Sequence, residues 1–236
     1  VGLGYGEHEF ATFNEPASAR TRAAMLDESL EVLTSLWSGE EVDYDGGHYQ
    51  IERTRFLPRP RQKPRIPIWV AGLWPNKAPF RRAARWDGVF PLPVNVERNL
   101  TPEEIREIVA YIRQHRESDA PFDVAHSGAT WGDADHRRAQ VEPYAEAGVT
   151  WWLENINPWR FDWAEEGPWP LAAMRQQILE GPHGVDVVAG HAVEARDAEI
   201  AVEVFVALDA CPEQLQGRAG IRPALSADGR GRRGGG

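Results

Sequence analysis

A short apolar run at residues 66–71 is the clearest strand in this sequence, and the segments on either side are organised around it. A continuous apolar run between turn residues is typical of a strand buried on both faces, and Gly72 would end this one. Asn76 then predicts a helix cap, and Pro79 would lie in the first turn, where its missing N–H costs nothing. The next apolar run, at residues 89–92, completes the strand–turn–helix–strand pattern of a βαβ unit.

Helical and strand periodicity continues along the rest of the chain. The predicted helices span residues 19–37, 101–116, 133–147 and 168–180. The further predicted strands span residues 1–3, 122–125 and 149–153, with a hairpin formed by 42–44 and 48–51. Thr101 and Glu104 have the spacing of a capping box at the start of the second helix. A loop is expected at residues 8–18, with Phe10 and Phe13 as its anchors.

Strands that alternate with helices indicate an α/β fold with a parallel sheet. The pattern yields five parallel strands, whereas a closed (β/α)8 barrel needs about eight strands and about 250 residues. The chain also begins with Val1 rather than Met, at what reads as the end of a strand. We therefore expect a TIM (β/α)8 barrel that is incomplete at the N-terminus.

The composition changes after residue 181, which divides the chain into a barrel portion, 1–181, and an unrelated segment, 182–236. Residues 191–206 could form one helix, and the Gly/Arg-rich end at 226–236 predicts a disordered tail. An RNA-binding tail is the alternative, but no aromatic residues are interleaved with its arginines, which favours a solvated tail.

Charge and cysteine content narrow the possible functions. The 236 residues carry a formal net charge of −10, which argues against a nucleic-acid partner and against an anionic membrane surface. A single cysteine, Cys211, excludes a disulfide framework and fits a reducing compartment. No apolar run approaches membrane-spanning length and no signal peptide is visible, so we expect a cytoplasmic protein.

Candidate chemistry falls where the predicted strands end, because barrel enzymes place their sites at the carboxyl ends of their strands. His126 and Glu154 are the candidate catalytic side chains there, and ordinary hydrogen bonding within loops is the alternative. The sequence contains no HExxH, CxxC or GxSxG, which leaves zinc, dithiol and hydrolase-elbow chemistry without support.

The turn after residues 66–71 joins a strand end to a helix start, where free N–H groups and the helix dipole favour an anion. A plain connecting loop explains it equally well, since no GxGxxG fingerprint is present. Trp74 and Tyr5 could flank a planar ring near this turn. Arg22 could meet a phosphate there, or could be a surface charge.

Several stretches, in unbroken order, resemble the luciferase-like monooxygenases. They are RAAMLDESLEVLTSLWSG at 22–39, YDGGHY at 44–49, FLPRP at 56–60, IPIWVAG at 66–72, RAARWDG at 82–88 and AGVTWWLE at 147–154. The resemblance covers roughly residues 1–181 and implies a (β/α)8 barrel of the bacterial-luciferase type with an insertion.

The resemblance also implies a reduced cofactor, FMN or the deazaflavin F420, which would act with oxygen or exchange a hydride with a small organic substrate. By analogy, the cofactor phosphate would meet Gly72, Leu73, Trp74, Asn76 and Lys77, with help from Arg22 and the turn at Tyr5. A flavin or F420 reductase is a possible partner, and a homo-oligomer is possible. The family's first three strands, which carry a catalytic histidine in some members, would precede Val1, so the catalytic base is unknown.

Two other functions stay open, namely a flavin- or ligand-holding barrel without turnover, and a barrel enzyme for a phosphorylated substrate. We also expect residues 1–236 alone to be poorly soluble or to associate through open sheet edges, and to bind reduced flavin weakly or not at all. A luciferase-like N-terminal segment of about 100 residues should then restore solubility and cofactor binding.

Overall fold

The computed structural model describes residues 1–3, 7–164 and 166–180. Tyr5, the predicted helix at 191–206, the tail at 226–236 and the segment 182–236 as a whole lie outside these ranges.

Four parallel strands form the sheet, in the order β3-β4-β5-β6. They span Trp69–Trp74, Gly88–Pro93, Asp123–Gly128 and Trp151–Glu154. Residues 1–3 lie beside β3, because the Val1 amino group donates to the Trp69 carbonyl at 2.7 Å and the Ala71 N–H donates to the Val1 carbonyl at 2.6 Å. The α/β class and the parallel sheet are thus confirmed, whereas closure into an eight-stranded barrel stays a prediction.

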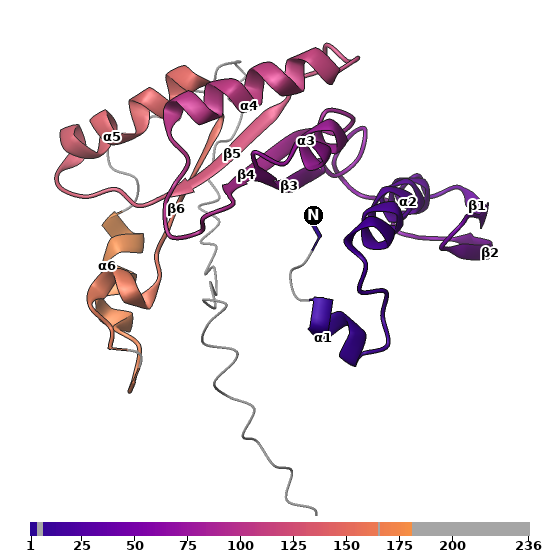
Figure 1. Cartoon of the computed structure of the whole chain (residues 1–236), viewed down its shortest axis with the longest axis horizontal. Helices are drawn as coiled ribbons and strands as arrows, with labels where there is room; N and C mark the ends of the chain where they lie inside the picture. Colours follow the sequence, from indigo (N-terminus) through magenta and orange to yellow (C-terminus); the bar gives the residue numbers. More distant parts are fainter. Residues whose placement is uncertain (4–6, 165, 181–236) are drawn as a thin grey trace, which may run out of the picture.

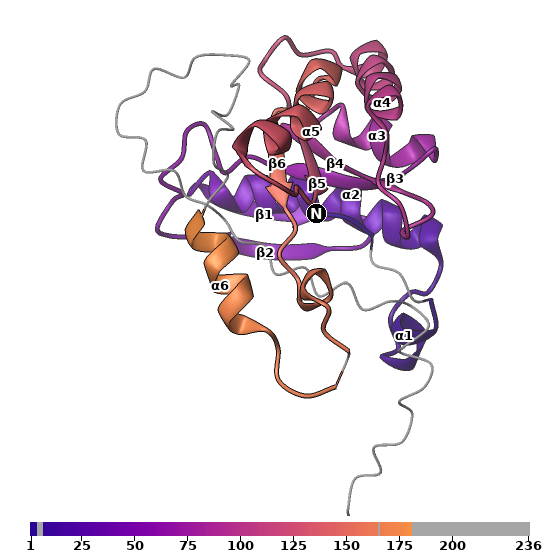
Figure 2. The same cartoon turned by 90° about the vertical axis from the view of Figure 1, so that its left-hand side faces the viewer.

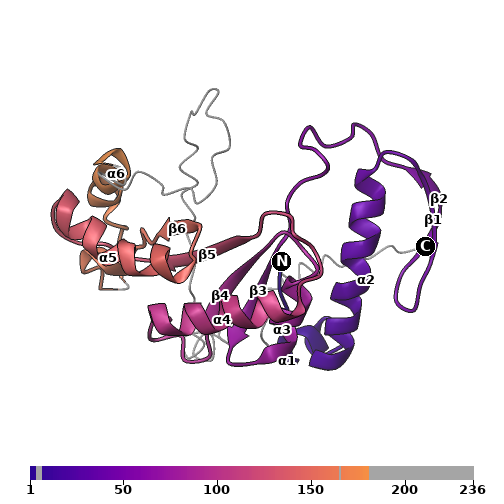
Figure 3. The same ribbon diagram turned by 90° about the horizontal axis from the view of Figure 1, so that it is seen from above.

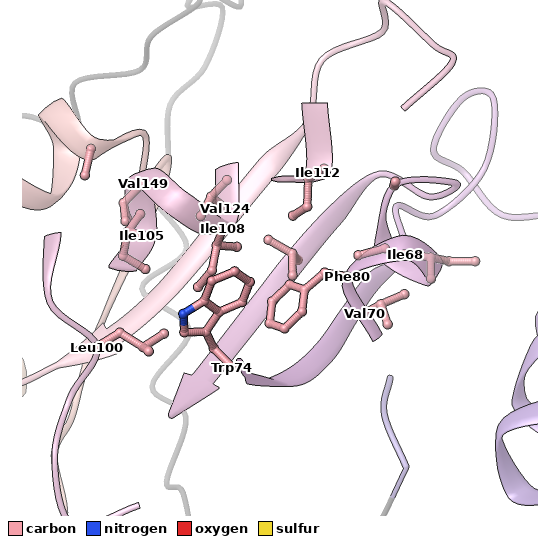
Figure 4. Close-up of a cluster of buried hydrophobic side chains, with 14 of the residues drawn as sticks. Ile68, Val70, Trp74, Phe80, Leu100, Ile105, Ile108, Ile112, Val124 and Val149 are labelled. Atoms are coloured by element: carbon pink, nitrogen blue, oxygen red, sulfur yellow. The ribbon is translucent and has the colours of Figure 1, made fainter. Parts of the chain in front are cut away.

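Helices α3, α4 and α5 cover one face of this sheet (Figures 1 and 2). They span Lys77–Ala83, Pro102–His115 and Ala134–Ala147. The predicted capping box of α4 is present, with the Thr101 hydroxyl accepting from the Glu104 N–H and the Glu104 carboxylate accepting from the Thr101 N–H. The α4 isoleucines, Phe80 of α3 and Trp74 of β3 share one buried cluster between helices and sheet (Figure 4).

The opposite face of the sheet carries a pair of tryptophans that meet across it. Trp69 begins β3 and Trp151 begins β6, yet their ring centroids are only 5.6 Å apart although two strands separate them. Both indole N–H groups donate to the Asp123 carboxylate, at 3.0 Å each. The outer strands are about three strand spacings of roughly 4.8 Å apart, a span that two indoles lying over the sheet can bridge. Gly88 of β4 makes room for this, because a Cβ there would meet the Trp69 ring at 2.5 Å.

The ladder between β4 and β5 is short and stops after two registered pairs, Gly88 with Asp123 and Val89 with Val124. The Val94 N–H donates to the Trp74 carbonyl of β3, so by alternation the nitrogens of Pro91 and Pro93 point toward β5. Proline has no N–H to donate, which explains why the ladder stops. The carboxyl halves of β4 and β5 are therefore not joined by registered pairs.

At one end of the sheet lie α2 and the hairpin of β1 and β2, and at the other end lie α5 and α6 (Figure 3). The bounds of these elements are Ala19–Trp37 for α2, Glu41–Asp45 and Gln50–Arg55 for the hairpin strands, and Leu171–Glu180 for α6, with a short 3-10 helix, η1, at Pro158–Phe161.

Helix α2 is tied to its neighbours by two carboxylates. Asp27 takes both a 2.7 Å and a 2.9 Å hydrogen bond from the buried Arg82 of α3. Glu28 accepts from the N–H groups of His48 and Tyr49 in the hairpin turn, the latter at 2.7 Å. The predicted bounds of α2 are confirmed, and so is the hairpin, although its second strand begins two residues later than predicted and runs to Arg55.

Two local predictions were wrong. Residues within 8–18 were expected to be a loop, but Glu7–Thr12 form helix α1, and Phe13 is 79% exposed rather than an anchor. The central strand begins three residues later than predicted, so Gly72 lies inside β3, paired with Pro91. In the part of the chain that the structure describes, no helix is both long and apolar enough to cross a membrane.

Candidate functional site at the carboxyl edge of the sheet

Gly72 was predicted to open an anion-binding turn, and the structure gives it a different place. It lies within β3 on the face toward α3, and a Cβ added there would meet the Cβ of Pro79 at 2.5 Å and a ring carbon of Phe80 at 3.4 Å. Gly72 is therefore required for the close packing of α3 on the strand. Leu73 is likewise a strand residue, so the turn proper is formed by residues 75 and 76.

Trp74 and Lys77 point away from the strand ends, into the helix layer. Trp74 is buried, with its ring edge-on to Phe80 at a centroid distance of 5.3 Å. The Lys77 ammonium lies 3.4 Å from the centroid of the Trp74 ring and 4.6 Å from that of Tyr111, which is a cation–π arrangement. Trp74 is thus a core residue, and its indole does not flank a planar ring near the turn after β3. Instead, the indole holds the Lys77 ammonium beside α4.

Asn76 and Arg22 complete the predicted cofactor set within the described residues. Asn76 is exposed at the N-cap of α3, and its side chain makes no capping hydrogen bond. The Arg22 guanidinium lies over the Phe10 ring of α1, 4.1 Å from the centroid. Asn76 and Lys77 are therefore neighbours because they are consecutive in the chain. The structure does not gather the other predicted cofactor-binding residues around them. Their role in cofactor binding stays a prediction.

His126 was expected just past a strand, but it lies inside β5 and is only 2% exposed. Its ring stacks on Tyr144 of α5 at 4.9 Å and meets Trp152 edge-on at 5.6 Å, so it faces the helix layer. Neither ring nitrogen has a hydrogen-bond partner among the described residues. Burial lowers the pKa of His126 to about 4, which keeps the ring neutral.

Glu154 ends β6 at the carboxyl edge, as predicted, and its carboxylate is fully engaged. One oxygen accepts from the Thr130 N–H at 2.8 Å and from the Arg160 guanidinium at 2.6 Å, and the other accepts from the Trp152 indole at 2.9 Å. The Arg160 side chain is 4% exposed and also donates to the carbonyls of Asn155 and Thr130. We call the Glu154–Arg160 pair the clasp, because it joins the loops that follow β5 and β6.

Arg160 and the tryptophans beside it were not predicted as site residues from the sequence. Trp131 lies on the loop after β5, with the Arg160 guanidinium 4.5 Å from its ring centroid. Beyond the clasp, Trp159 meets Trp163 edge-on at 5.7 Å, and Trp163 meets Trp169 at 6.5 Å. The available signal was the density of tryptophan after residue 150, together with Asn157 and Pro158, which mark a helix start.

A cleft of about 590 Å³ lies at the opposite, amino edge of the sheet, between the ends of α4 and α5. Its apolar floor includes Ile112, Phe122 and Val149. Barrel enzymes work at the carboxyl edge, so this cleft is separate from the candidate site. The described residues contain no group of three or more His, Cys, Asp or Glu side chains that could hold a metal ion.

Comparison with known proteins identifies the family. The profile of the luciferase-like monooxygenases matches residues 1–166, which is most of the chain. The chain belongs to the luciferase-like monooxygenase family. The resemblance drawn from the motifs is thereby confirmed.

Relatives of this luciferase-like chain include proteins with different cofactors. An uncharacterized protein of Mycobacterium tuberculosis is 30% identical over 131 residues, covering 52% of this chain and 41% of the relative. An F420-dependent glucose-6-phosphate dehydrogenase of Microbacterium testaceum is 32% identical over 77 residues, 32% of this chain and 22% of that protein. The oxygenase component of a flavin-dependent trigonelline monooxygenase of Acinetobacter baylyi is 29% identical over 82 residues, 34% of this chain and 22% of that protein.

Among solved structures, monooxygenase RslO1 from Streptomyces bottropensis matches with a TM-score of 0.42 and 22% identity, over 62% of this chain and 44% of that one. The chain thus spans less than half the length of these relatives.

Proposed function

We propose that this chain is part of a flavin- or F420-dependent oxidoreductase that acts on a small organic substrate. The observation that carries the proposal is the family match over residues 1–166, which spans all the strands of the parallel sheet. Named relatives use F420 in one case and a flavin in another, so both cofactors are candidates. When bound, either would supply two-electron chemistry that amino-acid side chains do not have.

The residues fit such a cofactor in part. Asn76 and Lys77 are both exposed at the start of α3, and they are the predicted residues that could meet an anionic group there. Lys77 would have to exchange its place over the Trp74 ring for that anion, a cation–π contact that is worth about 0.5–2 kcal/mol. A charge-assisted contact between Lys77 and a phosphate is at least comparable in strength, so a bound phosphate could replace the Trp74 ring as the partner of Lys77.

One observation favours a second candidate, a cofactor-holding barrel without turnover. Neither predicted catalytic side chain presents a free group at the carboxyl edge, since His126 faces the helix layer and Glu154 is held in the clasp. In that case the described residues would bind and orient the cofactor and would not move a proton.

The test is a titration of the chain, joined to the luciferase-like N-terminal segment that should restore cofactor binding, with FMN and, separately, with F420, followed by turnover of the reduced cofactor. We expect saturable binding of one of them, weakened by Lys77→Glu because the substitution replaces an attractive charge by a repulsive one. Lys63→Glu, an exposed lysine in the segment before β3, is the matched control and should leave binding unchanged. Binding without turnover would favour the second candidate, and no saturable binding of either cofactor would contradict both.

A further inference from the structure

Residues 56–64 follow the hairpin and form an exposed basic stretch, which we call the basic linker. It contains Arg59, Arg61 and Lys63 and no acidic residue, in a chain whose formal net charge is −10. All three residues are exposed, and none of them forms an ion pair within the part of the chain that the structure describes. The basic linker therefore carries three cations whose charge no described partner neutralises.

The basic linker is held in place against the end of α2. The Arg55 guanidinium donates to the Gly39 carbonyl at 2.6 Å, and a Cβ added at Gly39 would meet Cδ of Arg59 at 2.6 Å. The Arg59 side chain thus crosses directly over Gly39, and the three prolines of the linker fix further backbone angles. A surface that is ordered in advance loses little conformational entropy when a partner docks.

The charges beside the basic linker balance one another and leave the linker positive. The charged residues at its two ends are the acids Glu40, Glu41 and Asp87 and the arginines Arg53, Arg55 and Arg65. This group has three charges of each sign, four of them joined in two ion pairs, so it adds no net charge. The other hairpin acids, Asp43, Asp45 and Glu52, lie about 7–13 Å farther toward the turn, since each strand residue adds about 3.3 Å. Salt screens much of their effect over such distances.

Two large apolar side chains make the basic linker a mixed surface. Phe56 is 57% exposed and Leu57 is 64% exposed, and they directly precede the three cations in the chain. Adjacent exposed apolar side chains with charge around them are typical of protein contact sites. Such a surface fits an acidic segment that also carries apolar side chains.

A segment of that composition exists in this chain, outside the described residues. Residues 194–213 contain six acidic residues and a single arginine, and large apolar residues such as Ile200, Phe205 and Leu208 lie between the acids. The segment is therefore complementary to the basic linker both in charge and in apolar content.

This acidic segment is tethered within reach of the basic linker. Helix α6 ends at Glu180, and the residues between it and Glu194 can extend over about 45 Å. The hairpin and α6 lie at opposite ends of the four-stranded sheet (Figure 3), which spans about 15 Å at about 4.8 Å per strand. Because the segment belongs to the same chain, its effective concentration at the linker is about millimolar, which favours it over a separate partner.

We propose that residues 194–213 dock on the basic linker of the same chain, with their carboxylates against its three cations and their apolar side chains against Phe56 and Leu57. The linker leads into the amino end of β3, whereas the candidate site lies at the carboxyl edge of the sheet. The docking is therefore independent of the proposed cofactor chemistry, and either proposal can be wrong while the other holds.

The test uses the fact that Lys63 and Lys77 are the only lysines of this chain. A water-soluble carbodiimide joins a lysine amine to a carboxylate in contact with it, and mass spectrometry identifies the joined peptides. The chain carries the luciferase-like N-terminal segment, as in the cofactor titration, and each yield is divided by the acetylation rate of the same lysine. We expect Lys63 to link to residues 194–213 about tenfold more than Lys77, which is exposed but lies outside the linker.

Arg61→Glu tests the charge of the basic linker. It should lower the link between Lys63 and residues 194–213 about fivefold, because it replaces an attraction by a repulsion. Arg138→Glu, which changes an exposed arginine of α5 by the same charge, is the matched control and should leave the yield unchanged. An equal mixture of normal and ¹⁵N-labelled protein separates the two kinds of contact, because only a contact between copies joins light to heavy peptides.

Three results would overturn the docking. They are a Lys63 link no stronger than the Lys77 link, equal yields in Arg61→Glu and Arg138→Glu, and links that join light and heavy peptides as often as peptides of one label. The third result would assign the basic linker to a contact between copies of the chain.

Discussion

His126 should make the folded protein sensitive to mild acid. The ring is 2% exposed, lies between Tyr144 and Trp152, and has no hydrogen-bond partner for either nitrogen among the described residues. A proton added there would be an uncompensated buried charge, which is why the pKa falls to about 4. In the unfolded chain the same group would titrate at its ordinary value of about 6.5.

The size of the effect follows from these two values. As the pH falls below about 6.5, the unfolded chain takes up a proton on His126 that the folded protein refuses, so the free energy of unfolding decreases. The loss reaches about 3.4 kcal/mol once the pH is below about 4, and about 2 kcal/mol of it occurs between about pH 7 and pH 5. For a domain whose total stability is about 5–15 kcal/mol, this is a large fraction.

The assay is urea unfolding of the wild-type chain and of His126→Leu at several pH values in that window. Leucine is similar in size and carries no titratable group, so the variant should lose about 2 kcal/mol less than wild type on acidification. At neutral pH it should be at least as stable, since it removes two buried nitrogens without partners. Equal losses in the two proteins would show that His126 is hydrated or paired in solution and would refute the reasoning.

Two further predictions concern packing and charge. Gly72→Ala should destabilise the fold by about 1–3 kcal/mol in urea unfolding, because a Cβ there would meet α3 at 2.5 Å. Gly47→Ala is the control and should not destabilise it, since the nearest contact of a Cβ there is at 3.7 Å. Equal effects of the two substitutions would contradict the packing role of Gly72. Glu154→Ala should cost about 3–5 kcal/mol, because it leaves the Arg160 charge buried and unpaired. Glu103→Ala, which breaks an exposed ion pair, should cost less than about 1 kcal/mol in the same assay, and a similar loss from both would count against the clasp.

Local signals explain the parts of the fold that the sequence predicted well. The α4 capping box and the cap of α2, where Ser18 accepts from the Thr21 N–H, each join residues three positions apart, so the sequence contains these signals in full. Four of the five predicted parallel strands were likewise visible, because each is a short apolar run next to a helical pattern, whereas residues 1–3 lie beside β3 without forming a strand. The prediction of a loop at residues 8–18 was wrong because α1 has no comparable apolar periodicity that would have indicated a helix.

The site was harder to predict, because its geometry depends on contacts distant in sequence. Gly72 reads as a turn residue, and only the position of Pro79 against it shows that the glycine serves close packing. His126 was expected just past a strand because the predicted strand ended at residue 125. With β5 running from Asp123 to Gly128, alternation puts His126 on the same face as the buried Val124, toward the helices. The clasp was missed because nothing local pairs Glu154 with Arg160.

The pair of tryptophans at the amino edge gives the molecule a built-in optical reporter. The rings of Trp69 and Trp151 are 5.6 Å apart and inclined by 53°, and they belong to the first and last strands of the sheet. Chromophores this close and skewed exchange excitation energy, which splits their absorption into circular dichroism bands of opposite sign. Trp159 and Trp163, 5.7 Å apart, give a split signal of their own, so the share of the Trp69–Trp151 pair is the part that Trp151→Phe removes. That part exists only while β3 and β6 hold the two indoles together, so it reports the packing of this face of the sheet without any label.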